Sequence, residues 1–116
     1  MFVLDNTRDA YRSGHPTLEG RVAFTPSSPG QPDAAFIKEN DPTGANTALI
    51  QGYVTAGYMV RTRADGPVYQ SRDNDTAMRD AALASGAQWV STDYPLASYS
   101  ARWGTDYEAS IPGGTP

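Results

Sequence analysis

Short apolar runs recur along the chain, each about five residues long and bounded by Gly, Pro, Asp or Asn. Runs of this length are typical of strands that are buried on both faces, as in a parallel sheet. The pattern therefore predicts a set of short parallel strands. They cover residues 1–4, 21–24, 34–37, 57–61 and 87–91, and residues 33–40 fit either a strand or a short helix.

Helical patterns lie between some of these runs. Residues 43–56 have apolar side chains at helical spacing, with Thr43 as the expected N-cap and Gly57 just past the end. Residues 75–85 carry a second stripe of small and apolar side chains at this spacing. A weaker helix is expected over residues 7–13.

One repeat organises the second half of the sequence. A helix, Gly57 and a strand are followed about 30 residues later by a second helix capped by Asp75, by Gly86 and by another strand. Two such units imply parallel strands that are joined by helical crossovers. We therefore expect an α/β fold built of βα units.

Length and composition limit this fold. The chain has 116 residues, which allows one small domain but not a complete (β/α)₈ barrel, since that fold needs roughly 250 residues. It has 9 basic and 13 acidic residues, a net charge of −4, so nucleic-acid binding is not expected. The absence of cysteine excludes disulfides and thiolate chemistry. Neither a transmembrane segment nor a signal peptide is expected.

Polar and charged residues follow several of the predicted strands. They are Asp5 and Asn6, residues 25–28, residues 61–65 and residues 91–95. In parallel α/β folds, ligands bind at the carboxyl ends of the strands. These residues therefore fit one polar cleft, although polar loops also begin at strand ends without any ligand.

Arg61 and Arg63 lie two residues apart in a predicted strand, so their side chains point to the same face. Two guanidinium groups on one face repel each other unless an anion or a carboxylate lies between them. Guanidinium groups match the geometry of phosphate, which makes the pair a candidate phosphate site. The alternative is a structural salt bridge with Asp65 or Asp93.

Three further residues have candidate roles. Asp93 fits either a partner for an arginine or a helix cap. Asp5 offers an oxygen ligand of the kind that Ca²⁺ or Mg²⁺ takes, but one carboxylate cannot hold a metal alone. His15 is the single histidine and lies in a turn-like sequence, where a solvated side chain is more common than a catalytic one. Phosphodiester cleavage by two imidazoles is therefore not available to this chain alone.

Several segments together resemble the bacterial calcium-dependent phosphoinositide phospholipase C family. The resemblance covers about residues 1–110, and the ending TDYP alone is also similar to glycerophosphodiester phosphodiesterases. The segments are VLDN at 3–6, GRVAFT at 20–25, DAAFI at 33–37, NDP at 40–42, GYMVRTRAD at 57–65, DTAMRDAALASG at 75–86 and GAQWVSTDYP at 86–95.

The resemblance implies a TIM-type phosphodiesterase barrel, of which residues 1–100 correspond to the C-terminal half and residues 101–116 to a C-terminal tail that is loosely ordered at its end. In the family, the first half contributes the catalytic histidines and most calcium ligands. We therefore expect a fragment of a phosphoric diester hydrolase that requires Ca²⁺ when complete, is inactive alone, and belongs to a secreted parent family of lipid metabolism.

The resemblance also implies roles for individual residues. Arg61, Arg63, Asp93 and Tyr94 are expected to contact a phosphoinositide or another phosphodiester, and Asp5 to approach the metal. A half barrel leaves two open sheet edges, so we expect self-association or pairing with the missing N-terminal half. The competing possibilities are a non-catalytic module that binds phosphate or sugar phosphate, a glycerophosphodiester phosphodiesterase-like fragment, and a reading frame without function.

Overall fold

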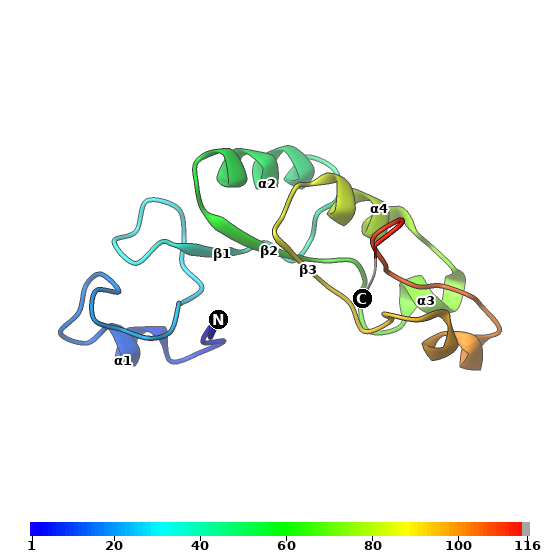
Figure 1. The fold of residues 1–116 in the computed structure, drawn as a ribbon, viewed down its shortest axis with the longest axis horizontal. Helices are drawn as coiled ribbons and strands as arrows, with labels where there is room; N and C mark the ends of the chain where they lie inside the picture. Colours follow the sequence, from blue (N-terminus) through cyan, green and yellow to red (C-terminus); the bar gives the residue numbers. More distant parts are fainter. Residues whose placement is uncertain (115–116) are drawn as a thin grey trace.

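A three-stranded parallel sheet forms the centre of the computed structural model, which describes residues 1–114 (Figure 1). The strands are β1 (Phe36–Lys38), β2 (Met59–Arg63) and β3 (Trp89–Ser91), in the spatial order β1-β2-β3. Both pairings are parallel. The prediction of an α/β fold with parallel strands is therefore confirmed, and residues 33–40 contain a strand rather than a helix.

The first two apolar runs lie beside this sheet but form single bridges instead of strands. Val3 pairs with Phe24 in parallel, and Pro26 pairs with Phe36 in parallel. The bridge to β1 includes the bond from the Ser27 N–H to the Phe36 carbonyl, at 3.1 Å. Proline has no N–H to donate, so Pro26 limits the ladder at this point.

The helices follow the expected order, with one addition. They are α1 (Arg8–Arg12), α2 (Asn46–Thr55), α3 (Tyr69–Asp73) and α4 (Ala77–Ala84), and two 3₁₀ turns follow β3, η1 (Ala97–Tyr99) and η2 (Ala101–Trp103). The sequence pattern did not predict α3. The two helix–glycine–strand units are confirmed, because Gly57 and Gly86 follow α2 and α4 with φ of +91° and +76°.

The expected caps differ in their outcome. The N-cap of α2 is Ala45, not Thr43, and Ala45 makes no side-chain cap bond. The Thr43 hydroxyl donates to Asp41 Oδ1 instead, at 2.7 Å. Asp75 is not the N-cap of α4 either, since that residue is Thr76, but Asp75 Oδ1 accepts a bond from the Ala77 N–H in the first turn, at 3.0 Å.

The core lies between the sheet and the helices α2 and α4, which both pack on β2. Its centre is Ile37, Ile50 and Val60, and all three are buried. Burial alternates along β2, and Val60 and Thr62 are fully buried on the helix-covered face. Arg61 and Arg63 consequently lie on the opposite face, which no helix of residues 1–114 covers (Figure 1).

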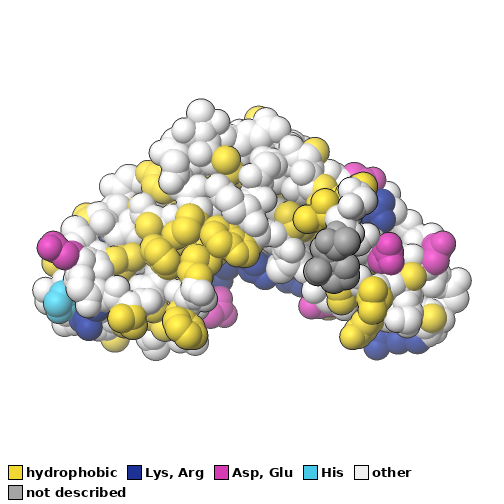
Figure 2. Space-filling view, in the orientation of Figure 1, with side chains coloured by type: hydrophobic (Ala, Val, Ile, Leu, Met, Phe, Trp, Pro, Cys, Tyr) yellow, Lys and Arg dark blue, Asp and Glu magenta, His cyan; other side chains and the backbone are white. Residues whose placement is uncertain are grey.

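The molecule is elongated and arched, with extents of 52 × 26 × 25 Å. Its radius of gyration is 16.0 Å, whereas a compact domain of about 100 residues has roughly 13 Å. Figure 2 shows a hollow below the sheet. The N-terminal and C-terminal segments project downward on either side of it. An uncovered sheet face therefore becomes the roof of an open concavity.

The segment expected to be a tail is packed over part of its length. Tyr107 is buried, and its ring meets the ring of Tyr94 edge-on with centroids 5.8 Å apart. The predicted loose end includes residues 115–116, which lie outside the described residues. No helix among the described residues is long and apolar enough to cross a membrane.

Candidate anion-binding cleft at the strand ends

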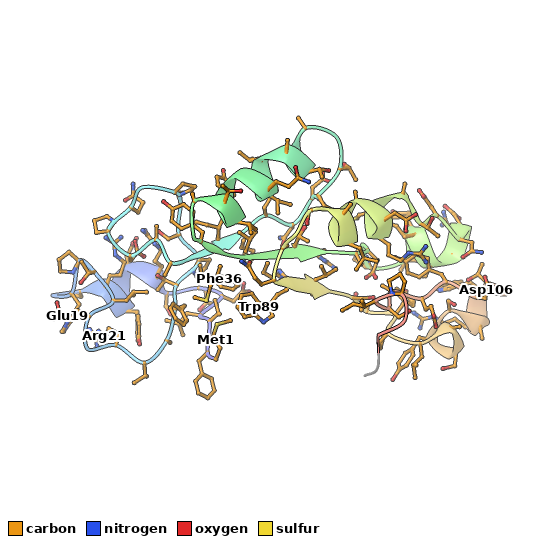
Figure 3. All side chains as sticks on the ribbon, turned by 45° about the horizontal axis from the view of Figure 1, so that its top comes forward. Met1, Glu19, Arg21, Phe36, Trp89 and Asp106 are labelled. Atoms are coloured by element: carbon orange, nitrogen blue, oxygen red, sulfur yellow. The ribbon has the colours of Figure 1, made fainter. Side chains whose placement is uncertain are left out.

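The concavity below the sheet contains a cleft of about 820 Å³. Its roof is the uncovered face of the sheet, and its wall is the N-terminal segment. In Figure 3, Met1, Phe36 and Trp89 lie together at this cleft. The lining residues are Met1, Val3, Leu4, Asp5, Pro26, Phe36, Lys38, Asn40, Arg61, Arg63, Trp89, Val90 and Ser91.

Strand register divides the roof into an apolar part and a cationic part. The rings of Phe36 and Trp89 form the apolar part, with centroids 5.9 Å apart. Lys38 is opposite Arg61 in the parallel ladder, and Arg63 follows two residues later on the same face. The carboxyl ends of β1 and β2 therefore bring three cationic side chains to one surface.

Arg61 is held by neutral acceptors. Its Nη1 donates to Asn40 Oδ1 at 2.9 Å, and its Nη2 donates to Ser91 Oγ at 2.7 Å. Within residues 1–114 no carboxylate forms an ion pair with this guanidinium. The two bonds fix the orientation of the side chain without neutralising its charge, which is the arrangement that an anion site requires.

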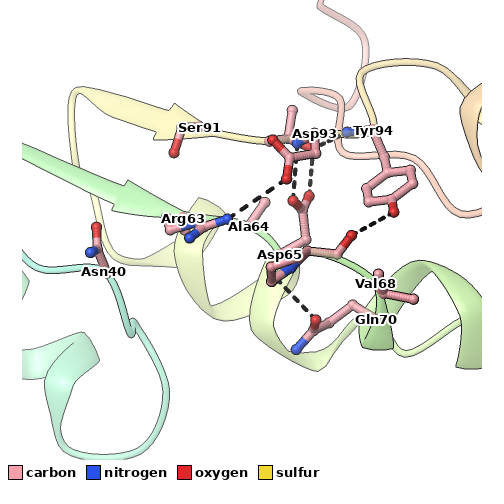
Figure 4. A network of polar contacts seen from close by, with 12 residues as sticks. Asn40, Arg63, Ala64, Asp65, Val68, Gln70, Ser91, Asp93 and Tyr94 are labelled. Carbon is pink, nitrogen blue, oxygen red and sulfur yellow. Dashed lines mark hydrogen bonds and ion pairs between the residues drawn. The ribbon is translucent and has the colours of Figure 1, made fainter.

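Arg63 has a carboxylate partner, as one of the two sequence interpretations proposed. Its Nη2 lies 3.8 Å from Asp93 Oδ2, and the Asp93 side chain is 61% exposed (Figure 4). An ion pair so long and so exposed is worth about 0–1 kcal/mol. Arg63 therefore keeps much of its capacity to bind an anion in the cleft, which it lines and Asp93 does not.

Asp65 is the group that fixes the end of β3 against the end of β2. Its fully buried carboxylate accepts bonds from the Thr92 hydroxyl at 2.5 Å and from the Asp93 N–H at 3.0 Å (Figure 4). The Tyr107 hydroxyl lies 3.4 Å away and donates to the Ala64 carbonyl. Burial and the nearby Asp65 charge raise the pKa of Tyr107, so its hydroxyl stays a donor. The sequence predicts Asp65 only as a salt-bridge partner for the pair Arg61 and Arg63, and the structure places it behind the cleft instead.

Tyr94 lies in the interior rather than in the cleft. Its side chain is buried, and its hydroxyl donates to the Pro67 carbonyl at 2.8 Å. The same oxygen accepts a bond from Arg102 Nη2 at 3.3 Å. In this geometry Tyr94 joins the loop after β3 to the loop after β2, and it has no surface in the cleft to offer to a substrate.

Asp5 lines the cleft, but its partner is Lys38. Lys38 Nζ lies 2.6 Å from Asp5 Oδ1, and this bond and the ammonium charge lower the pKa of Asp5, with a smaller contribution from Arg61. Ca²⁺ takes six to eight oxygen ligands. Within residues 1–114 no three His, Cys, Asp or Glu side chains are grouped as a metal site. These residues do not fit a calcium site by themselves, and the exposed His15 does not line the cleft.

A second polar cluster supports the N-terminal wall. Arg8 donates to both carboxylate oxygens of the buried Asp33, at 2.9 and 2.7 Å. Thr25 and Ser27 donate to the same carboxylate, at 2.7 and 2.9 Å. The cluster ties α1 to the segment that bridges to β1. No local sequence pattern predicts this cluster, because Arg8 and Asp33 are far apart in the chain.

The Asp33 cluster predicts a pH dependence of stability. Burial raises the pKa of Asp33, but the bonds from Arg8, Thr25 and Ser27 outweigh it and hold the pKa at about 2. A carboxyl with a lowered pKa stabilises the fold above its unfolded pKa and loses this contribution as the pH falls through the folded value. We expect a loss of about 2 kcal/mol between pH 5 and pH 2.

Urea unfolding across this pH range measures the effect. Asp33→Asn is expected to flatten the dependence, because the variant lacks the carboxyl group whose pKa the Arg8, Thr25 and Ser27 bonds lower, while its other carboxyl groups are unchanged. An equally steep dependence in the variant would show that Asp33 is not the responsible group.

The chain folds as an α/β protein with a cationic cleft at the ends of its parallel strands. A comparison with protein families gives a match. The family model described as "Phosphoinositide phospholipase C, Ca2+-dependent" matches residues 1–116, so the chain belongs to this family. The resemblance noted from the sequence is thereby confirmed. No curated protein and no solved structure matches the chain.

Proposed function

We propose that this chain forms the substrate-side wall of a phosphoric diester hydrolase that acts on phosphoinositides or related diesters. Arg61 carries the proposal, because two neutral acceptors fix its guanidinium beside the cleft, and no carboxylate of residues 1–114 forms an ion pair with it. Arg63 and Lys38 add positive charge on the same surface. Together they would hold the phosphate or the inositol hydroxyls.

The charge distribution supports an anionic ligand. The whole chain has a net charge of −4, yet the cleft collects three cationic side chains against one lining carboxylate. An excess of one sign in a cleft raises the local concentration of ligands with the opposite charge. The apolar part of the roof, with Phe36 and Trp89, offers a surface for the less polar part of a diester.

The proposal assigns binding to this chain and proton transfer to another segment. The chain has one histidine, and His15 is exposed and lies outside the cleft lining. We infer that residues 1–100 form the C-terminal half of a (β/α)₈ barrel, and that the complementary half supplies the acid, the base and the calcium ligands. The three-stranded parallel sheet with helices on one face and a concave opposite face supports this inference.

A phosphodiesterase assay tests this division of roles. In the presence of Ca²⁺, residues 1–116 alone are expected to give no turnover of phosphatidylinositol, because the cleft holds no general acid–base pair. The same chain extended by a complementary N-terminal half is expected to be active, and EDTA is expected to abolish that activity. Turnover by residues 1–116 alone, with loss in EDTA, would contradict the proposal and direct attention to His15 and Asp5.

The second candidate function is a binding module without catalysis. One observation favours it, namely the pairing of Asp5 with Lys38, because Asp5 is the only carboxylate that residues 1–114 contribute to the lining of the cleft. Such a module binds an inositol phosphate through Arg61 but gives no turnover even when the complementary half is supplied. The extended protein therefore distinguishes the two functions in a single assay.

A further inference from the structure

A second pocket, of about 320 Å³, adjoins the cleft. We call it the rim pocket, and its lining is Arg8, Pro26, Ser27, Ser28 and Lys38. Pro26 and Lys38 also line the cleft, so the two spaces meet at these residues. A ligand that extends past them from the cleft therefore contacts the rim pocket as well.

The rim pocket lies at the ends of strands, as the cleft does. Ser27 and Ser28 directly follow the residue that bridges to β1, and Lys38 is the last residue of β1. Arg8 is the first residue of α1. In parallel α/β folds, ligands bind at the carboxyl ends of the strands. The rim pocket is consequently on the side of the molecule where a ligand is expected.

Arg8 is oriented by a buried carboxylate. Its Nε and Nη2 donate to the two oxygens of Asp33, at 2.9 and 2.7 Å, and Nη2 also donates to Ser27 Oγ at 3.1 Å. Its third nitrogen, Nη1, donates no hydrogen bond within residues 1–114. The ion pair of Nη1 is to Asp9 at 3.5 Å, and that side chain is 95% exposed. The Nη1 donors are therefore available to an anion while the rest of the guanidinium is fixed.

Lys38 and Ser28 add further donors to the rim pocket. The Lys38 ammonium bonds to Asp5, which is 87% exposed, and a pair so exposed contributes little to stability. An ammonium has three donors, so two remain for a ligand. Ser28 is exposed and offers its hydroxyl. No carboxylate of residues 1–114 is in the lining, so the donors match a phosphate group.

The nearby carboxylates limit which phosphate the rim pocket can hold. Asp33 and Asp5 compensate part of the charge of Arg8 and Lys38, so an isolated phosphate is expected to bind weakly. A phosphate that belongs to a ligand already held in the cleft is present at a high effective concentration. The geometry therefore favours a second phosphate on the same ligand over a free phosphate ion.

We propose that the rim pocket binds a second phosphate group of a ligand whose first phosphate lies in the cleft at Arg61. The inference rests on the proposed function for the first phosphate and makes the substrate class narrower. It specifies inositol diesters that carry a further phosphate on the inositol ring. Arg8 Nη1, the Lys38 ammonium and the Ser28 hydroxyl would donate to that ring phosphate.

The test compares the affinities of residues 1–116 for glycerophosphoinositol and for its 3-, 4- and 5-phosphates by isothermal titration calorimetry. At least one of the three phosphates is expected to bind about tenfold more tightly than glycerophosphoinositol, because the ring phosphate gains charge-assisted hydrogen bonds. Inorganic phosphate at the same concentration as the ligand is expected to leave this preference unchanged. If it removes the preference, the rim pocket takes free phosphate and the proposal is overturned.

Two variants remove the preference if the rim pocket is the site. Ser28→Asp places a carboxylate in the lining, where it repels a phosphate. Arg8→Lys keeps a positive charge beside Asp33 but has one nitrogen in place of three, so the donors of Nη1 are lost. Ser98→Asp is the matched control, because it makes the same charge change at an exposed residue of η1 outside both linings. It is expected to keep the preference, and thermal melts establish that all variants fold.

The outcomes separate this inference from the proposed function. The inference is overturned if no ring phosphate binds more tightly than glycerophosphoinositol, or if Ser28→Asp and Ser98→Asp lower the preference equally, since then only net charge matters. Arg61→Ala is expected to weaken the binding of all these ligands by the same factor. If it leaves the affinity for glycerophosphoinositol unchanged, the proposed function fails. The preference for a ring phosphate, and its loss in Ser28→Asp, then still decide whether the rim pocket binds a phosphate.

Discussion

Replacing Asp65 by alanine is expected to lower the free energy of unfolding by about 2–4 kcal/mol. The carboxylate is fully buried and accepts bonds from the Thr92 hydroxyl and the Asp93 N–H. Without it, these donors lose their partner in a region that water does not reach easily, and each unpaired buried group costs about 1–3 kcal/mol. Urea unfolding monitored by far-UV circular dichroism measures the change.

Asp93→Ala is the control for this variant, because it removes the neighbouring carboxylate from an exposed position. Its ion pair with Arg63 is long, so a loss below about 1 kcal/mol is expected. Asp65→Asn keeps one acceptor oxygen and should fall between the two alanine variants. Equal unfolding midpoints for Asp65→Ala and Asp93→Ala would show that Asp65 does not hold the ends of β2 and β3 together.

The central part of this fold could be predicted from local sequence. Gly57 and Gly86 adopt positive φ after α2 and α4, and glycine tolerates this conformation better than any other residue. The strand that follows each glycine is short and begins with two apolar residues, so the helix–glycine–strand unit has three independent local signals. No helix ends directly before either of the first two apolar runs, and they form bridges instead of strands.

Long-range contacts explain most of what the sequence did not predict. The short helix α3 has no apolar periodicity, and only Ser71 in it is buried. The partners of Asp65 are Thr92 and Asp93, which belong to another strand end. Tyr107 belongs to a polar C-terminal segment in which local sequence predicts no packed residue, but its ring packs on Tyr94. Composition near a residue does not reveal a partner that the topology brings from elsewhere.

The candidate site likewise combines residues that local sequence predicts with residues that only long-range contacts bring to it. The alternation of strand residues correctly placed Arg61 and Arg63 on one face. The same alternation puts Lys38 on the same face of β1 as Phe36. Its place beside Arg61 depends on the register of β1 against β2, which the sequence does not determine. Tyr94 was expected in the site because the strand-end motif contains it. A motif identifies a place in the chain but not the direction in which a side chain points.

Arg61→Ala is expected to weaken the binding of inositol phosphate or glycerophosphoinositol to residues 1–116 about 10- to 100-fold. A hydrogen bond to a charged partner is worth about 1.5–3 kcal/mol, and a factor of ten in affinity corresponds to about 1.4 kcal/mol. The fold is expected to survive, because the Ser91 hydroxyl keeps its bond to the Thr62 carbonyl. Isothermal titration calorimetry at low salt measures the affinity, since screening weakens such contacts.

Two further variants establish whether the geometry of Arg61 matters as well as its charge. Arg61→Lys keeps the charge but loses the planar fork, so an intermediate affinity is expected. Arg72→Ala removes a guanidinium that pairs with Asp73 on α3, outside the cleft lining, and should leave the affinity unchanged. If Arg61→Ala and Arg72→Ala have the same effect, the ligand responds only to the overall charge of the protein. In that case Arg61 is not a binding residue, and its bonds to Asn40 and Ser91 serve the structure of the strand ends alone.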